Sequence, residues 1–207
     1  MSTISILFLI GAGVMAYVAV QTLKQTEMKI ASDFDSPDAA LKRAQEEESN
    51  NFNKVMERVD HAFEEGKYHD AESALETALG MRPDNEEVLG KMAYVLEKHG
   101  DIEAATAVYV RALEIHTQSA ELFASYASML KSAGNLEESK KNYINAVQLE
   151  PNNPLIYYNF SNLLAELGEI DAAKEGYQRA LDIDKNFKEA REALSALSMK
   201  KLDTPSA

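Results

Sequence analysis

Residues 136–153, LEESKKNYINAVQLEPNN, decide the fold of this chain because their pattern returns at a fixed interval. Residues 170–183, IDAAKEGYQRALDI, begin 34 residues later and repeat the same small and aromatic positions. Four sets of residues keep this interval: the glycines Gly66, Gly100, Gly134 and Gly168; the alanines Ala78, Ala112, Ala146 and Ala180; the large residues Leu75, Tyr109, Tyr143 and Tyr177; and the small residues Ala71, Ala105, Ser139 and Ala173. Several sets in one register predict a tandem array of a single unit.

The repeated positions also predict local structure. Each glycine is expected to end a helix, since the left-handed conformation of a helix C-cap costs glycine least. Asp101 and Asn135, which follow two of these glycines, are expected to cap the next helix. The alanines leave room for paired helices to approach closely, and Tyr109, Tyr143 and Tyr177 are expected to fill the space against the next unit. Stability should therefore come from contacts between neighbouring units.

This pattern resembles the tetratricopeptide repeat, a helix–turn–helix unit of about 34 residues. The resemblance implies an all-α fold, a right-handed α-solenoid in which neighbouring units stack. The expected parts are four repeat units at residues 52–85, 86–119, 120–153 and 154–187, a capping helix at residues 188–201 and a disordered tail at residues 202–207.

The beginning of the chain carries a different signal. Residues 4–20, ISILFLIGAGVMAYVAV, contain Ser5 as their only clearly polar side chain. A helix over residues 4–23 is about 30 Å long, which matches the hydrocarbon thickness of a bilayer. We therefore predict a transmembrane anchor at residues 1–23. Residues 24–51 are expected to form a linker and a leading helix, with Ser36 as N-cap and Pro37 as the first helical residue.

Two alternatives to a permanent anchor remain open, a cleaved signal peptide and a buried core helix. The start, MSTIS, lacks the basic residues of a signal peptide, whereas a helix that is apolar all round is unusual beside a repeat array. Lys24 and Lys29 follow the apolar segment, and no basic residue precedes it in the sequence. The positive-inside rule therefore places the array on the cytoplasmic side of the membrane.

Charge and composition exclude several classes of function. The chain contains 21 lysines and arginines against 34 aspartates and glutamates, which gives a formal net charge of −13. Such an acidic protein repels phosphate backbones, so no nucleic-acid partner is expected. The absence of cysteine excludes disulfides, thiolate zinc sites and cysteine nucleophiles.

The sequence gives no positive sign of catalysis. The histidines fall at different positions of the repeat: His61, His69, His99 and His116. His61 has helical spacing to Glu64 and Glu65, but a solvated helix face explains these residues better than a metal site. His69 and His99 stand near turns, where polar residues are ordinary. No Gly-rich phosphate loop occurs in the array. We therefore predict no enzymatic activity, no cofactor and no metal site.

The resemblance also implies a binding surface, since the first helices of such units line a concave groove that receives a peptide or a partner helix. The candidate groove residues are Met56, Asp60, Lys91, Tyr94, Ser125, Ser128, Lys131, Tyr158, Asn159 and Asn162. Tyr158, Asn159 and Asn162 are expected to form a patch that bonds a peptide backbone, unless the two amides are ordinary surface residues. An acidic floor is expected around Glu57, Asp60, Glu87 and Glu121 and would favour a basic segment of the partner.

These observations predict a membrane-anchored adaptor that assembles partner proteins through the groove. Anchoring would raise the effective concentration of the groove for partners at the same membrane. Two alternatives share the fold. One is a secreted or periplasmic assembly factor with a cleaved leader, and the other is a non-catalytic regulatory subunit of an enzyme complex.

Overall fold

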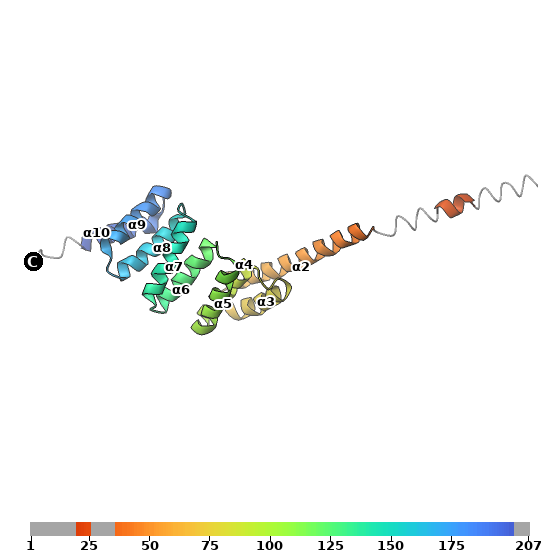
Figure 1. The fold of residues 1–207 in the computed structure, drawn as a ribbon, viewed down its shortest axis with the longest axis horizontal. Coiled ribbons are helices and arrows are strands. Elements are labelled where there is room, and N and C mark those ends of the chain that lie inside the picture. Colours follow the sequence, from red (N-terminus) through yellow and green to blue (C-terminus); the bar gives the residue numbers. More distant parts are fainter. Residues whose placement is uncertain (1–19, 26–35, 201–207) are drawn as a thin grey trace, which may run out of the picture. The chain divides into compact units, whose positions relative to one another are not determined.

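The computed structural model describes residues 20–25 and 36–200 (Figure 1). Apart from residues 20–23, the predicted anchor lies outside the described residues, as does the predicted tail. Residues 20–25 are helical and exposed. Among the helices that the structure describes, none combines the length and the apolar character needed to cross a bilayer.

The part of the chain that the structure describes is all-α. Its helices from residue 37 onward are α2 (Pro37–Glu64), α3 (Tyr68–Met81), α4 (Glu86–Lys98), α5 (Ile102–Ile115), α6 (Ala120–Ser132), α7 (Leu136–Leu149), α8 (Pro154–Glu166), α9 (Ile170–Ile183) and α10 (Lys188–Lys200). The chain divides into two compact parts, residues 1–53 and residues 54–207. In the first part, α2 begins at Pro37, and the Ser36 hydroxyl accepts a hydrogen bond from the backbone N–H of Ala39 at 3.2 Å. This N-cap was predicted and is confirmed.

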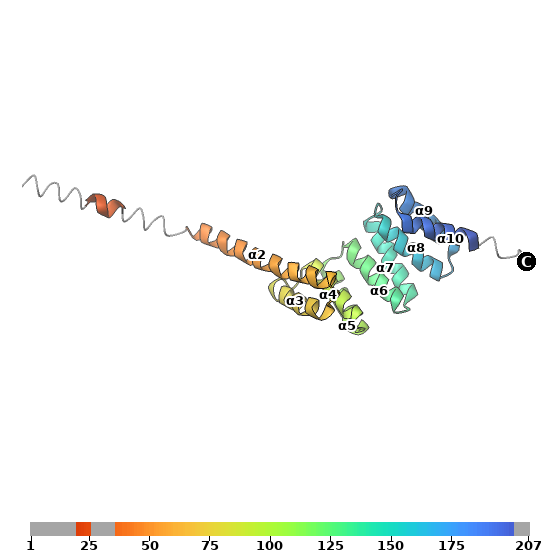
Figure 2. The same cartoon turned by 180° about the vertical axis from the view of Figure 1, so that it is seen from behind.

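In the second part, consecutive helices pack in antiparallel pairs, α4 with α5, α6 with α7 and α8 with α9 (Figure 2). A glycine of positive φ stands before the second helix of each pair: Gly100 at 82°, Gly134 at 81° and Gly168 at 79°. The residue after each glycine donates its backbone N–H to a carbonyl five residues earlier, at 2.8–3.0 Å. This is the Schellman arrangement, and it confirms that the repeated glycines end helices.

Side-chain caps begin most of the paired helices. Asn85, Ser119 and Asn153 accept backbone N–H groups in the first turns of α4, α6 and α8. Asp101 accepts the N–H of Ala104 at 3.0 Å, as predicted. The corresponding prediction for Asn135 is wrong, because its side chain makes no cap hydrogen bond. Two glutamates in the first turn of α7 complement the helix dipole there instead.

The core lies where the repeat predicts it. The four alanines of the Ala78 set are fully buried, and Tyr109, Tyr143 and Tyr177 are each at most 3 % exposed. Tyr109 belongs to a cluster of residues from α4, α5 and α6, so it links one helix pair to the next. Tyr143 does the same for α6, α7 and α8. Ser139 replaces an alanine of its set and donates its hydroxyl to the Ala127 carbonyl at 2.6 Å. The prediction of contacts between neighbouring units is confirmed.

The last helix covers the end of the array. Ala190 of α10 is buried in a cluster with Leu164, Tyr177 and Ala180, and Leu194 and Leu197 pack against the same cluster.

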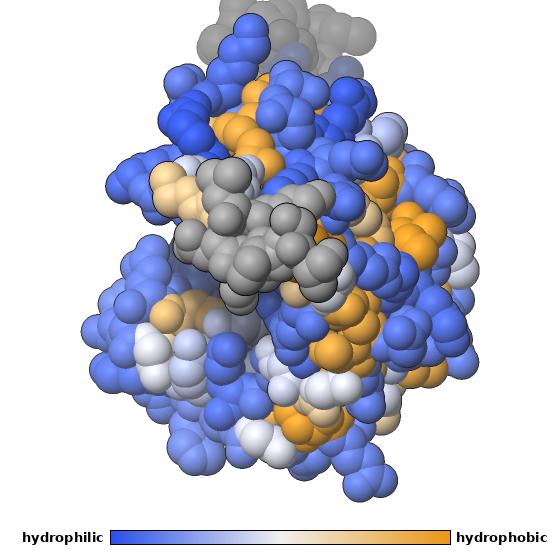
Figure 3. Space-filling model, turned by 90° about the vertical axis from the view of Figure 1, so that its left-hand side faces the viewer, coloured by the Kyte–Doolittle hydropathy of each residue, from blue (hydrophilic) through white to orange (hydrophobic). Residues whose placement is uncertain are grey.

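Figure 3 shows a largely hydrophilic face on which hydrophobic side chains are separated by polar ones. A partner that approaches this face therefore meets mostly polar and charged groups.

Candidate partner-binding groove

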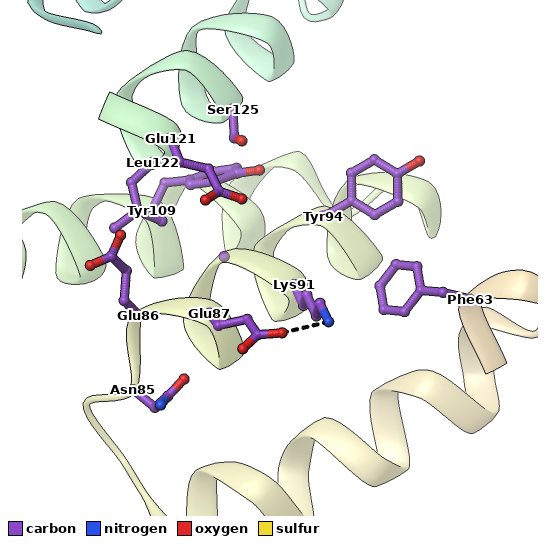
Figure 4. Close-up of a pocket in the computed structure, with 11 residues that line it drawn as sticks. Phe63, Asn85, Glu86, Glu87, Lys91, Tyr94, Tyr109, Glu121, Leu122 and Ser125 are labelled. Atoms are coloured by element: carbon purple, nitrogen blue, oxygen red, sulfur yellow. Dashed lines mark hydrogen bonds and ion pairs between the residues drawn. The ribbon is translucent and has the colours of Figure 1, made fainter. Parts of the chain in front are cut away.

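Two neighbouring hollows lie along the first helices of the pairs. The first, of about 430 Å³, is lined mainly by α4 and α6, and Figure 4 shows its side chains. The second, of about 510 Å³, extends from α4 and α6 to α8. Both are lined by Tyr94, Tyr109, Glu121 and Ser125, so they form one continuous groove. We call this surface the groove.

The floor of the groove is aromatic and apolar. Tyr109 reaches it from α5 and is only 1 % exposed, and Leu122 of α6 lies beside it. The Tyr109 ring packs on Tyr126 with the ring centroids 5.3 Å apart. Burial, together with the charge of Glu97, raises the pKa of the Tyr109 hydroxyl. Tyr109 therefore stays neutral at physiological pH and closes the bottom of the groove as a buried, uncharged side chain.

One end of the groove carries an aromatic cluster that the sequence did not indicate. Phe63, Tyr68 and Tyr94 have ring centroids 5.8–6.2 Å apart. The Lys98 ammonium lies 4.6 Å from the centroid of the Tyr94 ring. Phe63 and Tyr68 flank Gly66, so the turn at this glycine brings their rings together. The flanking of a repeat glycine by two aromatic residues is the signal that could have predicted the cluster.

The charge of the groove is acidic because carboxylates outnumber the two lysines that line it, Lys91 and Lys98. The Lys91 ammonium contacts the Asp60 carboxylate at 2.5 Å and the Glu87 carboxylate at 2.7 Å. Partial burial by itself lowers the pKa of Lys91, but these hydrogen bonds and negative charges outweigh burial and raise it. Glu86 and Glu121 also line the first hollow, and the second hollow adds further carboxylates.

Most of the predicted groove residues from the middle of the array line the groove. Lys91, Tyr94, Ser125, Ser128 and Asn159 do so directly.

The predicted residues on α2, and Lys131 of α6, make other contacts. Asp60 reaches the groove through its ion pair with Lys91. Met56 is only 8 % exposed and so offers little surface. Lys131 contacts Glu166 at 4.0 Å. Of the predicted acidic floor, Glu57 lies apart and lines a different hollow with Lys54, Arg58 and His61.

The expected patch on α8 is divided between two roles. Asn159 lines the groove, but the side-chain oxygen Oδ1 of Asn162 accepts a hydrogen bond from the Tyr177 hydroxyl at 2.6 Å. The Tyr158 ring packs on Tyr177 and Phe187, with ring centroids 5.9 and 5.1 Å apart. Tyr177 of α9 and Phe187 after it thus leave Tyr158 only partly exposed, and sequence spacing alone does not show these contacts.

The geometry defines a helical repeat protein with an acidic groove along the first helices of its pairs. The family model of the tetratricopeptide repeat matches residues 62–129 and 130–197, more than half of the chain. The chain therefore belongs to the tetratricopeptide repeat family, whose members mediate protein–protein interactions.

Several solved structures share this fold. PilF from Pseudomonas aeruginosa is 18 % identical, covers 75 % of this chain and 71 % of its own, and has a TM-score of 0.69. A crystal structure of MamA is 21 % identical over 74 % of this chain and 84 % of its own, with a TM-score of 0.60. YrrB, a protein of this family described as having an unusual peptide-binding site, is 20 % identical over 71 % of this chain and 76 % of its own, with a TM-score of 0.58. No curated protein matches the sequence of this chain.

Proposed function

We propose that this protein is a membrane-anchored adaptor that holds an extended, basic segment of a partner protein in its groove. One observation carries the proposal: α4, α6 and α8 line a continuous groove that has an aromatic floor and an excess of carboxylates. The adaptor acts by bringing partners together and not by catalysis. YrrB, which has the same fold and a peptide-binding site, supports a peptide as the ligand.

The groove offers a distinct contact to each part of such a segment. Glu121, exposed on the rim, attracts a lysine or arginine of the ligand. The exposed part of Tyr94 suits the apolar stem of a long side chain, since the Lys98 ammonium already lies over its ring. Ser125 and Ser128 hydroxyls and the Asn159 amide can bond the ligand backbone, because these groups both donate and accept hydrogen bonds.

Charge reversal inside and outside the groove tests this proposal. Glu121→Lys changes the groove, and Glu114→Lys makes the same change of charge on exposed α5 outside it. Fluorescence anisotropy of the full chain should show tighter binding of an unstructured Lys/Ser peptide than of its Glu/Ser counterpart. Glu121→Lys should weaken binding of the basic peptide about fivefold, or about 1 kcal/mol, and Glu114→Lys should change it little. Equal effects of the two variants, or no preference between the peptides, would contradict the proposal.

The same proposal places the groove beside a membrane, with the array on the cytoplasmic side. Its support is the apolar sequence of residues 4–20 and the lysines Lys24 and Lys29 that follow it. Confinement to a bilayer raises the effective concentration of the groove for partners at that membrane without new contacts.

Extraction of membranes at alkaline pH tests the anchor. The full chain should remain with the membrane pellet in carbonate, and a variant that lacks residues 1–23 should be released. Intact-mass measurement of the full chain should find the N-terminal segment retained. Release of the intact chain would rule out the anchor. A mature N-terminus within residues 14–24 would show that the segment is a cleaved leader and not a permanent anchor.

A further inference from the structure

Two histidines and a glutamate converge at the junction of α3 and α4. His69 and Glu72 stand three residues apart near the start of α3, a spacing that places them on one face of the helix. His99 is the C-cap residue of α4. The same carboxylate oxygen, Glu72 Oε2, lies 3.1 Å from His99 Nδ1 and 3.8 Å from His69 Nδ1. The centroids of the two imidazole rings are 4.8 Å apart.

We propose that His69, Glu72 and His99 form a binding site for Zn²⁺ whose fourth position is open to water. Imidazole nitrogen and carboxylate oxygen are common zinc ligands, and three such ligands with a fourth open position are a known arrangement. Two ligands of a tetrahedral zinc ion are about 3.3 Å apart, given metal–ligand distances of about 2.0–2.1 Å. The two distances to Glu72 Oε2 bracket this value, and the three ligand atoms all lie within 4.8 Å of one another.

The exposure of the three side chains suits a site that can close around an ion. The side chains of Glu72 and His99 are 28 % and 25 % exposed, so both are less free to move than that of His69, although the His99 residue as a whole is exposed. The His69 side chain is 92 % exposed and can rotate toward the ion without disturbing the core. Because the carboxylate faces both imidazoles, it supplies the negative charge that a divalent cation requires.

Other histidines of the described chain show what distinguishes this group. His61 contacts Glu65 at 3.3 Å and His116 contacts Glu86 at 3.5 Å, and each is a pair with a single imidazole. Within residues 36–200, His69, Glu72 and His99 form the group in which three potential ligand atoms come this close. The site does not depend on the proposed groove function. Sequence analysis predicts no metal site at His69 and His99, so the titration described below decides between that prediction and this proposal.

A bound ion would connect two helices, α3 and α4. His69 and Glu72 belong to α3, whereas His99 ends α4, so coordination ties the start of one helix to the end of the next. A ligand that binds only the folded state stabilises that state. Zinc is therefore expected to raise the thermal stability of the chain as well as to bind it.

Calorimetric titration of the chelator-treated full chain with ZnCl₂ tests the proposal, in detergent micelles if the chain needs them. We expect saturable binding of one Zn²⁺ per chain and a zinc-dependent rise in the melting temperature. His99→Ala and Glu72→Gln should abolish both effects. His69→Ala, at an exposed position where folding is not at risk, should do the same.

His61→Ala is the matched control, since it removes an exposed imidazole from a His–Glu pair without a third ligand. It should leave both the titration and the melting shift unchanged. Non-saturating binding by the wild-type chain would overturn the site. So would binding that persists in His69→Ala, or that is lost equally in His61→Ala.

Discussion

The middle helix pairs and the last pair use equivalent repeat positions for different purposes. Tyr94 of α4 and Asn162 of α8 occupy the same place in the 34-residue repeat. Tyr94 is 36 % exposed and lines the groove, whereas Asn162 accepts a hydrogen bond from Tyr177 and holds α8 to α9. The repeat thus fixes which face of a helix a residue occupies, and the neighbouring helices decide whether that face binds a ligand or packs.

We expect the largest loss of stability from a substitution in the hydrophobic core, which the middle helix pairs and the last pair share. Tyr143 is 1 % exposed, packs against residues of α6 and α8, and has its ring centroid 5.7 Å from that of Phe160. Tyr143→Ala should reduce the free energy of unfolding by about 3–5 kcal/mol, because it leaves a cavity between two helix pairs. Tyr177→Ala, in the last pair, should cost less, since the end of a repeat array can open locally. Urea unfolding followed by circular dichroism measures the free energy of unfolding of both variants. An equal loss in the two would contradict the expected difference between the middle and the end of the array.

Overpacking the same interface should have the next largest effect. Ala146 is fully buried where α7 meets its neighbours. Ala146→Leu should destabilise the chain by roughly 1–3 kcal/mol, because the close-packed helices must move apart to accept the larger side chain. A melting temperature equal to that of the wild type would contradict the assigned register.

Local and periodic features of the fold could be predicted from the sequence, but the details of the groove could not. The positive φ of Gly100, Gly134 and Gly168 and the burial of the repeat alanines follow from short-range spacing. Whether Asn162 is free depends on Tyr177, fifteen residues away on another helix. Such a contact needs the angle between helices, which no single repeat specifies.

Dependence on how separate helices pack also explains why the sequence did not reveal the aromatic cluster or the histidine cluster. Phe63, Tyr68 and Tyr94 come from three helices, and their aromatic cluster forms only when α3 and α4 are docked. His69 and His99 occupy unrelated repeat positions and meet because one helix begins where another ends. For the histidines neither residue type nor periodicity indicates the contact, and for the aromatic cluster the only sign is the pair of aromatic residues that flank Gly66.

Replacing each of the two asparagines of α8, Asn159 and Asn162, with alanine tests directly whether a repeat position serves packing or ligand binding. Asn162→Ala removes the acceptor of the Tyr177 hydroxyl and should lower the free energy of unfolding by about 1–2 kcal/mol. Asn159→Ala, one turn earlier on the groove, should leave stability nearly unchanged and weaken binding of the basic peptide. Measuring both quantities for both variants separates packing from recognition. If Asn162→Ala weakens binding without loss of stability, the last pair is a recognition surface after all.

The smallest expected effect concerns the paired cation of the groove. Asp60 and Glu87 raise the pKa of Lys91 above its ordinary value of 10.5. A raised pKa in the folded chain means that the ion pairs stabilise it at neutral pH and up to the ordinary lysine pKa. This stabilisation is lost as the pH rises through the higher pKa of the folded state. Lys91→Met should therefore cost at most about 1 kcal/mol near neutral pH, since solvent screens partly exposed pairs.

The difference between this variant and the wild type should shrink when both are unfolded in urea at strongly alkaline pH. Glu87→Gln, which removes one partner and keeps the cation, should show a smaller part of the same pH dependence. A difference that is constant across the alkaline range would show that Lys91 contributes through its packed stem and not through its charge. In that case Lys91 is available to a ligand, and so are the carboxylates of Asp60 and Glu87 that face it.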